Sequence, residues 1–196
     1  MMQEFTDRTK GIFEAVQGQY GSVASHYGFG CEGCEDNCCT QRFFHHTYAE
    51  YYYLLEGMKK AEPEVVYRII TRSRVVVDAY RKELEMGELL PLMCPVNFEG
   101  RCALYEHRPM ICRMHGLPHS FRMPDGRVQE GGGCGRFDAL HKADLRVDRT
   151  ALYTELAMIE RDLRVRLGLR GRFRKTTAEM VLDMLEHLDL GEEEEG

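Results

Sequence analysis

Eight cysteines, gathered into two groups, constrain this chain more than any other feature of its sequence. The first group has the spacing Cys31-x2-Cys34-x3-Cys38-Cys39, which places four thiols within nine residues. Glycines and turn-forming residues surround these thiols, so the segment predicts an irregular loop. The alternatives are inert buried thiols or a set of disulfides. Closely spaced cysteines in a polar, glycine-rich loop favour metal or cluster binding over both.

The second group is more widely spaced and consists of Cys94, Cys102, Cys112 and Cys134. It lies in a second region predicted to be irregular, 91–136, which holds most of the prolines and a run of three glycines. We expect the two loops to meet in space and to share a metal centre. The predicted metal ligands are Cys31, Cys34, Cys38, Cys39, Cys94, Cys102, Cys112 and Cys134.

The type of metal stays open between an iron–sulfur cluster and zinc, because sets of four thiolates bind either one. Neither group has the CxxC…CxxC pattern of a zinc ribbon or the Cys-x2-Cys-x2-Cys-x3-Cys pattern of a bacterial ferredoxin. Eight thiols allow two four-ligand sites, one site with spare cysteines, or a dinuclear or mixed Cys/His site. The histidines near the two loops are His45, His46, His107, His115 and His119.

Helical periodicity dominates the rest of the chain, so the predicted fold class is mainly α, with helices surrounding two irregular Cys-rich loops that converge on a metal centre. Capping boxes at Thr47-Tyr48-Ala49-Glu50 and Thr176-Thr177-Ala178-Glu179 mark two helix starts. The expected helices span about 3–20, 47–60, 62–84, 141–168 and 176–189. We expect a single domain over 1–190, with its metal-binding core at about 28–136, followed by a disordered acidic tail at 191–196.

Charge and hydropathy exclude several classes of protein. The net charge is −6, and four of the negative charges are the glutamates of 192–195, so no overall field favours nucleic acid. The arginine-rich stretch 161–175 is more typical of a solvated helix end than of a nucleic-acid surface. No stretch approaches the ~18 apolar residues of a membrane span. The first residues have no signal-peptide pattern, so we expect a cytoplasmic protein with reduced thiols and no membrane partner.

Two blocks of sequence resemble a known family. The first is Cys31-Glu-Gly-Cys34-Glu-Asp-Asn-Cys38-Cys39, and the second runs from Cys94-Pro through Cys102-Ala-Leu-Tyr to Arg-Pro-Met-Ile-Cys112-Arg. Together they are similar to the YkgJ-like cysteine-cluster proteins, which have a CxxCxxCC-type zinc- or iron-chelating domain. The similarity covers roughly 28–136, and the gap before Cys38-Cys39 is three residues where the family pattern has two. The resemblance implies a metal-binding protein but no settled reaction.

Three hypotheses for function follow. The first is a cytosolic metal-binding protein in which an iron–sulfur cluster or zinc has a structural, sensing or carrier role. The second is a metal- or cluster-dependent enzyme related to the flagellin lysine N-methylases, in which a related cysteine cluster occurs. The third is a zinc-stapled interaction scaffold that binds a partner through the arginine-rich stretch. No pair of carboxylates stands out as catalytic, so the sequence names no catalytic residue, substrate or protein partner.

Overall fold

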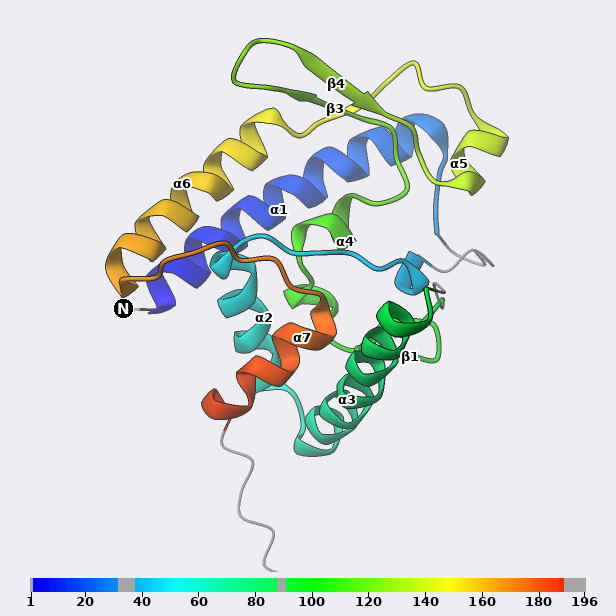
Figure 1. Cartoon of the computed structure of the whole chain (residues 1–196). Helices are drawn as coiled ribbons and strands as arrows, with labels where there is room; N and C mark the ends of the chain where they lie inside the picture. Colours follow the sequence, from blue (N-terminus) through cyan, green and yellow to red (C-terminus); the bar gives the residue numbers. More distant parts are fainter. Residues whose placement is uncertain (1, 32–37, 88–90, 189–196) are drawn as a thin grey trace, which may run out of the picture.

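The computed structural model describes residues 2–31, 38–87 and 91–188, and α-helices dominate this part of the chain. The prediction of a mainly α fold is therefore confirmed at this level (Figure 1). No helix among the described residues combines the length and the apolar character needed to cross a bilayer. Residues 32–37, 88–90 and 189–196 lie outside the described part, and they include Cys34 and the predicted acidic tail.

The longest helix, α1 (Met2–Tyr27), packs against α2 (Tyr48–Lys60), α4 (Met110–Met114) and α6 (Thr150–Leu167). In Figure 1 α1 and α6 run alongside each other. The shared core includes Phe13, Val16, Met114 and Leu163, which are all almost fully buried. The rings of Phe13 and Tyr53 meet edge to face at 5.1 Å between centroids. Burial of such side chains contributes roughly 1.5–3 kcal/mol each to folding.

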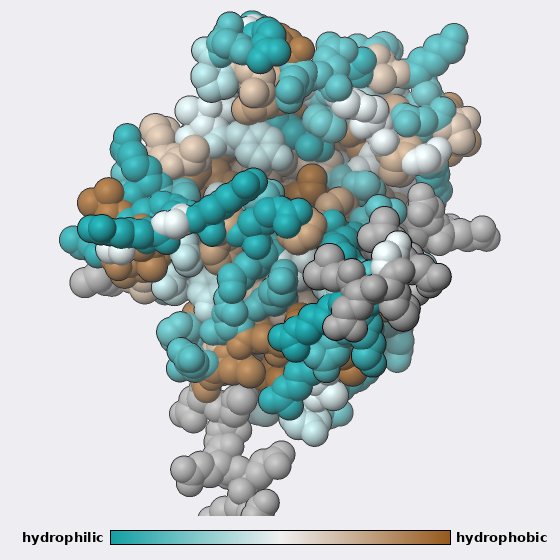
Figure 2. Space-filling view, viewed as in Figure 1, coloured by the Kyte–Doolittle hydropathy of each residue, from teal (hydrophilic) through white to brown (hydrophobic). Residues whose placement is uncertain are grey.

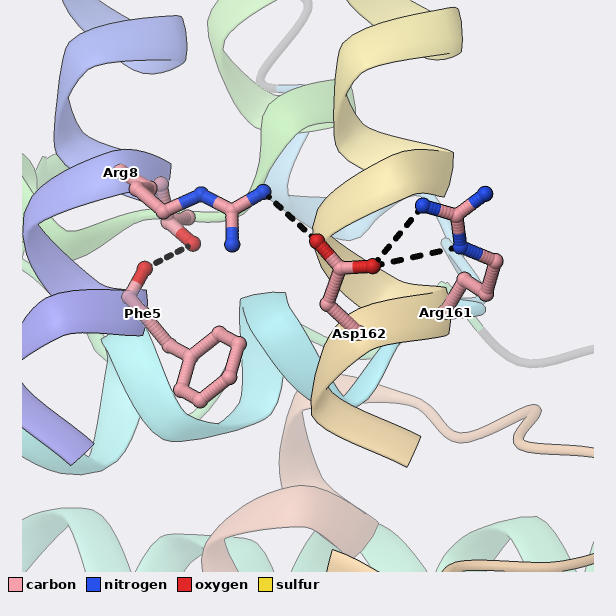
Figure 3. Close-up of polar contacts among 5 residues, drawn as sticks. Phe5, Arg8, Arg161 and Asp162 are labelled. Atoms are coloured by element: carbon pink, nitrogen blue, oxygen red, sulfur yellow. Dashed lines mark hydrogen bonds and ion pairs between the residues drawn. The ribbon is translucent and has the colours of Figure 1, made fainter. Parts of the chain in front are cut away.

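A polar contact joins the surfaces of α1 and α6 (Figure 3). The Arg8 guanidinium is 3.0 Å from the Asp162 carboxylate, which Arg161 also contacts at 3.0 Å. The Arg8 guanidinium carbon lies 5.8 Å from the centre of the Phe5 ring. All three charged groups are substantially exposed, so water screens the attraction and the pairs contribute little to stability.

A second core forms where α3 (Pro63–Met86) meets α7 (Thr177–Asp183) and the 3₁₀ turn η3 (Met184–His187). Ile69, Met180 and Met184 are fully buried there, together with Leu54 of α2. Figure 2 shows a largely hydrophilic face, with apolar side chains visible in the region of α7 and α3. Thr47 and Thr176 cap α2 and α7 as predicted, and Pro63 occupies the first turn of α3.

Short strands occupy part of the region 91–136, which we predicted to be irregular. β1 (Asn97–Phe98) and β2 (Arg101–Cys102) form a small hairpin, and η2 (Tyr105–His107) leads on towards α4. β3 (His119–Arg122) pairs with β4 (Val128–Gly131) on one side and with β5 (Val147–Asp148) on the other. α5 (Gly135–Leu140) follows β4. β1–β2 and β3–β4 pair locally, and only β5 pairs with a strand further away along the chain. These short strands show no hydropathy alternation that would predict them.

Two predicted helix boundaries are wrong. The first helix continues beyond residue 20 to Tyr27, because Val23 packs against the cluster that contains Phe137. The helix predicted over 141–168 begins only at Thr150. Residues 147–149 are held instead in extended pairing with the segment 118–120, and Leu145 is 40% exposed. The last predicted helix, 176–189, consists of α7 and the 3₁₀ turn η3.

Candidate metal centre

Five of the predicted cysteine ligands line one cavity of about 100 Å³. Two come from the first cysteine group and three from the second. The cavity also has apolar walls, which include Leu54 of α2 and Val96. The five cysteines are Cys38, Cys39, Cys94, Cys102 and Cys112. The structure thus places cysteines of both sequence groups in the walls of one cavity.

Backbone contacts hold the five cysteines around the cavity. The 3₁₀ turn η1 (Cys38–Thr40) carries the first two, and the Cys39 carbonyl accepts a 2.8 Å hydrogen bond from the Cys94 amide. The β1–β2 hairpin sets Cys102 opposite Asn97, whose side chain accepts a 3.1 Å bond from the Gly100 amide in the turn. Gly100 has φ 83°, a conformation that glycine adopts without strain. The short helix α4 supplies Cys112.

Cys38 and Cys39 differ in acidity although they are neighbours. The hydrogen bond between their side chains lowers the pKa of Cys39 to about 6 and raises the pKa of Cys38. Burial opposes the effect on Cys39, while Asn97 and Arg108 add to it. Cys39 is therefore the thiol that most readily becomes a thiolate, which is the form that binds metals.

The three cysteines of the second group that line the cavity are held as neutral thiols by burial. Burial raises the pKa of Cys94 to about 12 and raises that of Cys102. Cys112 is half-buried, and desolvation together with the neighbouring thiols raises its pKa well above the ordinary value. Each also responds to the charge of the other thiols, which shows how close the groups lie. A bound cation reverses this effect, because it favours thiolates.

Two arginines flank Cys112 in the sequence, and the structure gives them different surroundings. Arg113 is buried, donates to the backbone carbonyl of Arg108 at 2.9 Å and to that of Glu106, and lies 4.7 Å above the Phe13 ring. Arg113 therefore fixes the loop. Arg108 lines the cavity and lies 3.8 Å from the centre of the Tyr105 ring. Its positive charge lies beside the thiols and offsets thiolate charge.

Cys31 and Cys134 lie near Tyr20, outside the group that lines the cavity. The Tyr20 hydroxyl donates to the His115 carbonyl at 3.1 Å. Burial raises the pKa of Tyr20, and the nearby Cys31 and Cys134 raise it further. Cys31 is exposed, whereas Cys134 is half-buried. The eighth predicted ligand, Cys34, falls outside the described residues.

Among residues 2–31, 38–87 and 91–188, no three His, Cys, Asp or Glu side chains stand in an arrangement ready to hold a metal ion. None of the seven cysteines in the described part of the chain forms a disulfide. Of the histidines named from the sequence, His107 stacks near Tyr53 at 5.0 Å and His115 near Phe43 at 5.3 Å. The walls described for the cavity contain no histidine. The arrangement offers sulfur as its donor, which is the ligand that zinc and iron–sulfur clusters accept.

Sequence analysis missed the contribution of the C-terminal segment. Thr176, Thr177 and Ala178 line the cavity beside the cysteines. They arrive there because His45 and Lys175 form an isolated antiparallel bridge, with backbone bonds of 2.7 and 3.1 Å. The capping box at Thr176 predicted this helix start, but nothing in the sequence indicated that Lys175 would pair with His45, 130 residues away.

Comparison of the chain with family models, curated proteins and solved structures found no match.

Proposed function

We propose that this chain is a cytoplasmic metal-binding protein that holds zinc or an iron–sulfur cluster through the cysteines of the cavity. The observation that supports the proposal is the presence of five thiols from two distant sequence segments around one small space. The resemblance of the two cysteine blocks to YkgJ-like proteins points to the same chemistry. The proposed ligands are drawn from Cys38, Cys39, Cys94, Cys102 and Cys112.

The thiol donors and the size of the cavity fit zinc or an iron–sulfur cluster. A cavity needs roughly 10–15 Å³ to hold one water, and this one measures about 100 Å³. Four thiolates around a divalent cation leave a net charge of about −2, and Arg108 stands where it offsets that charge. The described cysteines form no disulfide, which suits a reducing compartment.

The role we propose for the metal is structural. The five cysteines come from η1, from the segment before β1, from β2 and from α4, which are all short elements. A metal bound by these elements ties together segments that are about 75 residues apart in the sequence. Because an unfolded chain has no preformed site, metal binding of this kind contributes directly to folding.

Anaerobic purification followed by metal analysis, an acid-labile sulfide assay and an absorption spectrum tests the proposal. Brown protein with labile sulfide identifies an iron–sulfur cluster, and colourless protein with zinc identifies a zinc site. Purified protein that holds no metal and takes up neither zinc nor iron with sulfide refutes the proposal.

Two variants locate the site. Cys112→Ser removes a thiol of the cavity and should abolish or sharply lower metal content. Cys134→Ser is the matched control, because Cys134 lies beside Tyr20 and outside the cavity. Equal loss of metal from the two variants contradicts the assignment of the site to the cavity.

A further inference from the structure

A line of hydrogen-bonding side chains runs from the cysteine cavity into the protein interior. Thr177 and Cys94 both line the cavity, and a side-chain hydrogen bond from Thr177 lowers the pKa of the Cys94 thiol against the larger, opposite effect of burial. On its other side the Thr177 hydroxyl is 3.0 Å from Nε2 of His45. His45 is 1% exposed, and its Nδ1 is buried without a hydrogen-bond partner. The nearest carboxylate to Nδ1 is Glu50, at 3.9 Å.

The geometry determines which groups donate along this line. A hydroxyl has one proton to donate, and its oxygen accepts. If Thr177 donates to the Cys94 sulfur, its oxygen receives the proton of His45, so that proton is on Nε2. Nδ1 is then the unprotonated nitrogen, which agrees with its lack of an acceptor. Glu50 has other partners, because it accepts from the Met110 amide at 3.1 Å and from the Thr47 hydroxyl at 2.7 Å.

The fold holds both side chains rigidly in place. The backbone bridge between His45 and Lys175 fixes the spacing of the two segments, and Thr177 follows two residues later at the start of α7. The flanking rings of Tyr48 and Phe173 meet at 4.5 Å and pack the same junction from one side. A neutral imidazole buried at such a junction has one orientation and one partner, which is what a positioning residue requires.

We propose that His45 and Thr177 are positioning residues for the metal centre, in which the imidazole orients the Thr177 hydroxyl so that it donates a hydrogen bond to the sulfur of Cys94. This inference rests on the function proposed above. Hydrogen bonds to ligand sulfurs withdraw electron density from the metal–thiolate bond and tune the affinity and electronic properties of the centre. His45 thus acts on the centre without binding the metal itself.

Thr177→Val tests the inference, because it removes the hydroxyl and keeps the shape of the side chain. Outer-shell changes of this kind typically cost about 10–100-fold in metal affinity. We expect Thr177→Val to lose its metal to excess chelator about tenfold faster than the wild-type protein. Thr177→Ser keeps a hydroxyl and should restore the wild-type rate. His45→Gln presents an amide donor near the position of Nε2 and should also stay close to wild type, whereas His45→Leu should behave like Thr177→Val.

Glu179→Ala separates a local effect from general loosening of α7. The Glu179 carboxylate completes the capping box by accepting from the Thr176 amide and hydroxyl, so its loss weakens the start of the helix but leaves the Thr177 hydroxyl in place, and Glu179 is not among the residues that line the cavity. Metal release as fast in Glu179→Ala as in Thr177→Val overturns the inference in favour of a purely structural role. Unchanged release in Thr177→Val also overturns it.

A spectroscopic measurement adds a readout that loosening of the fold does not move. With cobalt(II) loaded into the full chain, loss of a hydrogen bond to one sulfur shifts the thiolate-to-cobalt charge-transfer band to lower energy. We expect the shift in Thr177→Val and not in Thr177→Ser or Glu179→Ala. An unshifted band in a normally loaded Thr177→Val protein refutes the inference alone. A wild-type chain that binds neither its native metal nor cobalt refutes the proposed function and the inference together.

Discussion

The buried His45 should make the protein measurably less stable in mild acid. Burial lowers the pKa of this imidazole from 6.5 to about 4, and the neighbouring His46 adds a smaller effect in the same direction. Below pH 6.5 the unfolded chain takes up a proton that the folded chain refuses until about pH 4. Stability linked to His45 is therefore complete above pH 6.5 and is lost as the pH falls through this window.

The size of the effect follows from the two pKa values. One pKa unit corresponds to about 1.4 kcal/mol, so the full shift represents roughly 3.4 kcal/mol, of which roughly 2 kcal/mol is lost between pH 7.5 and pH 5. The groups that face the ring are Glu50, whose own pKa is raised by burial, and the uncharged Thr177. Neither supplies a firmly held negative charge that would restore the ordinary pKa.

Urea unfolding of the wild-type protein and of His45→Gln, at pH 7.5 and at pH 5, measures this effect. The glutamine does not titrate, so the variant should lose roughly 2 kcal/mol less between the two pH values than the wild type. Comparing two proteins removes the contribution of all other titrating groups, including the thiols. Equal pH dependence in the two proteins refutes the argument, because it means that the folded chain accepts the His45 proton as easily as the unfolded chain does.

Three further substitutions test the packing. Ile69→Ala opens the core between α3 and α7 at a fully buried position and should lower the free energy of unfolding by about 2–5 kcal/mol in urea; a loss below about 1 kcal/mol would contradict the assigned packing. Asp162→Asn removes the exposed charge between Arg8 and Arg161 and should change stability by less than about 1 kcal/mol in the same assay; a larger loss would mean that the pair is better shielded than its exposure indicates. Gly116→Ala places a Cβ 3.1 Å from the Tyr20 hydroxyl at φ 108°, so it should lower the thermal midpoint, and an unchanged midpoint would show that this turn relaxes.

The helices that the sequence predicted well are those with local signals at their starts. Thr47 and Thr176 carry capping boxes, and Pro63 stands in a first turn, so α2, α3 and α7 begin where expected. The start of α6 depended on a distant event, the parallel pairing of β5 with β3. The continuation of α1 past residue 20 depended on packing of Val23 against Phe137. Local propensity contains neither of these contacts.

Cysteine spacing placed the eight thiols in two sequence groups, but it did not predict how they divide in space. Five thiols line the cavity, while Cys31 and Cys134 lie beside Tyr20. Different backbone hydrogen bonds produce this division. The Cys94 amide donates to the Cys39 carbonyl and holds the end of the first loop at the cavity, whereas the Cys134 amide donates to the Gly116 carbonyl at 3.0 Å. Spacing alone contains no information on either bond.

The C-terminal segment connects the cavity to the rest of the fold. The shape of the cavity therefore depends on elements that lie far apart in the described chain. Phe173 packs in the core with Leu54 and Met180, and Thr177 reaches the cavity two residues after the bridge to His45. The same short stretch therefore closes the cavity and docks α7 on α3. A metal bound by the cysteines would stabilise this docking, and loosening of α7 would open the cavity, because the two events share one segment of backbone.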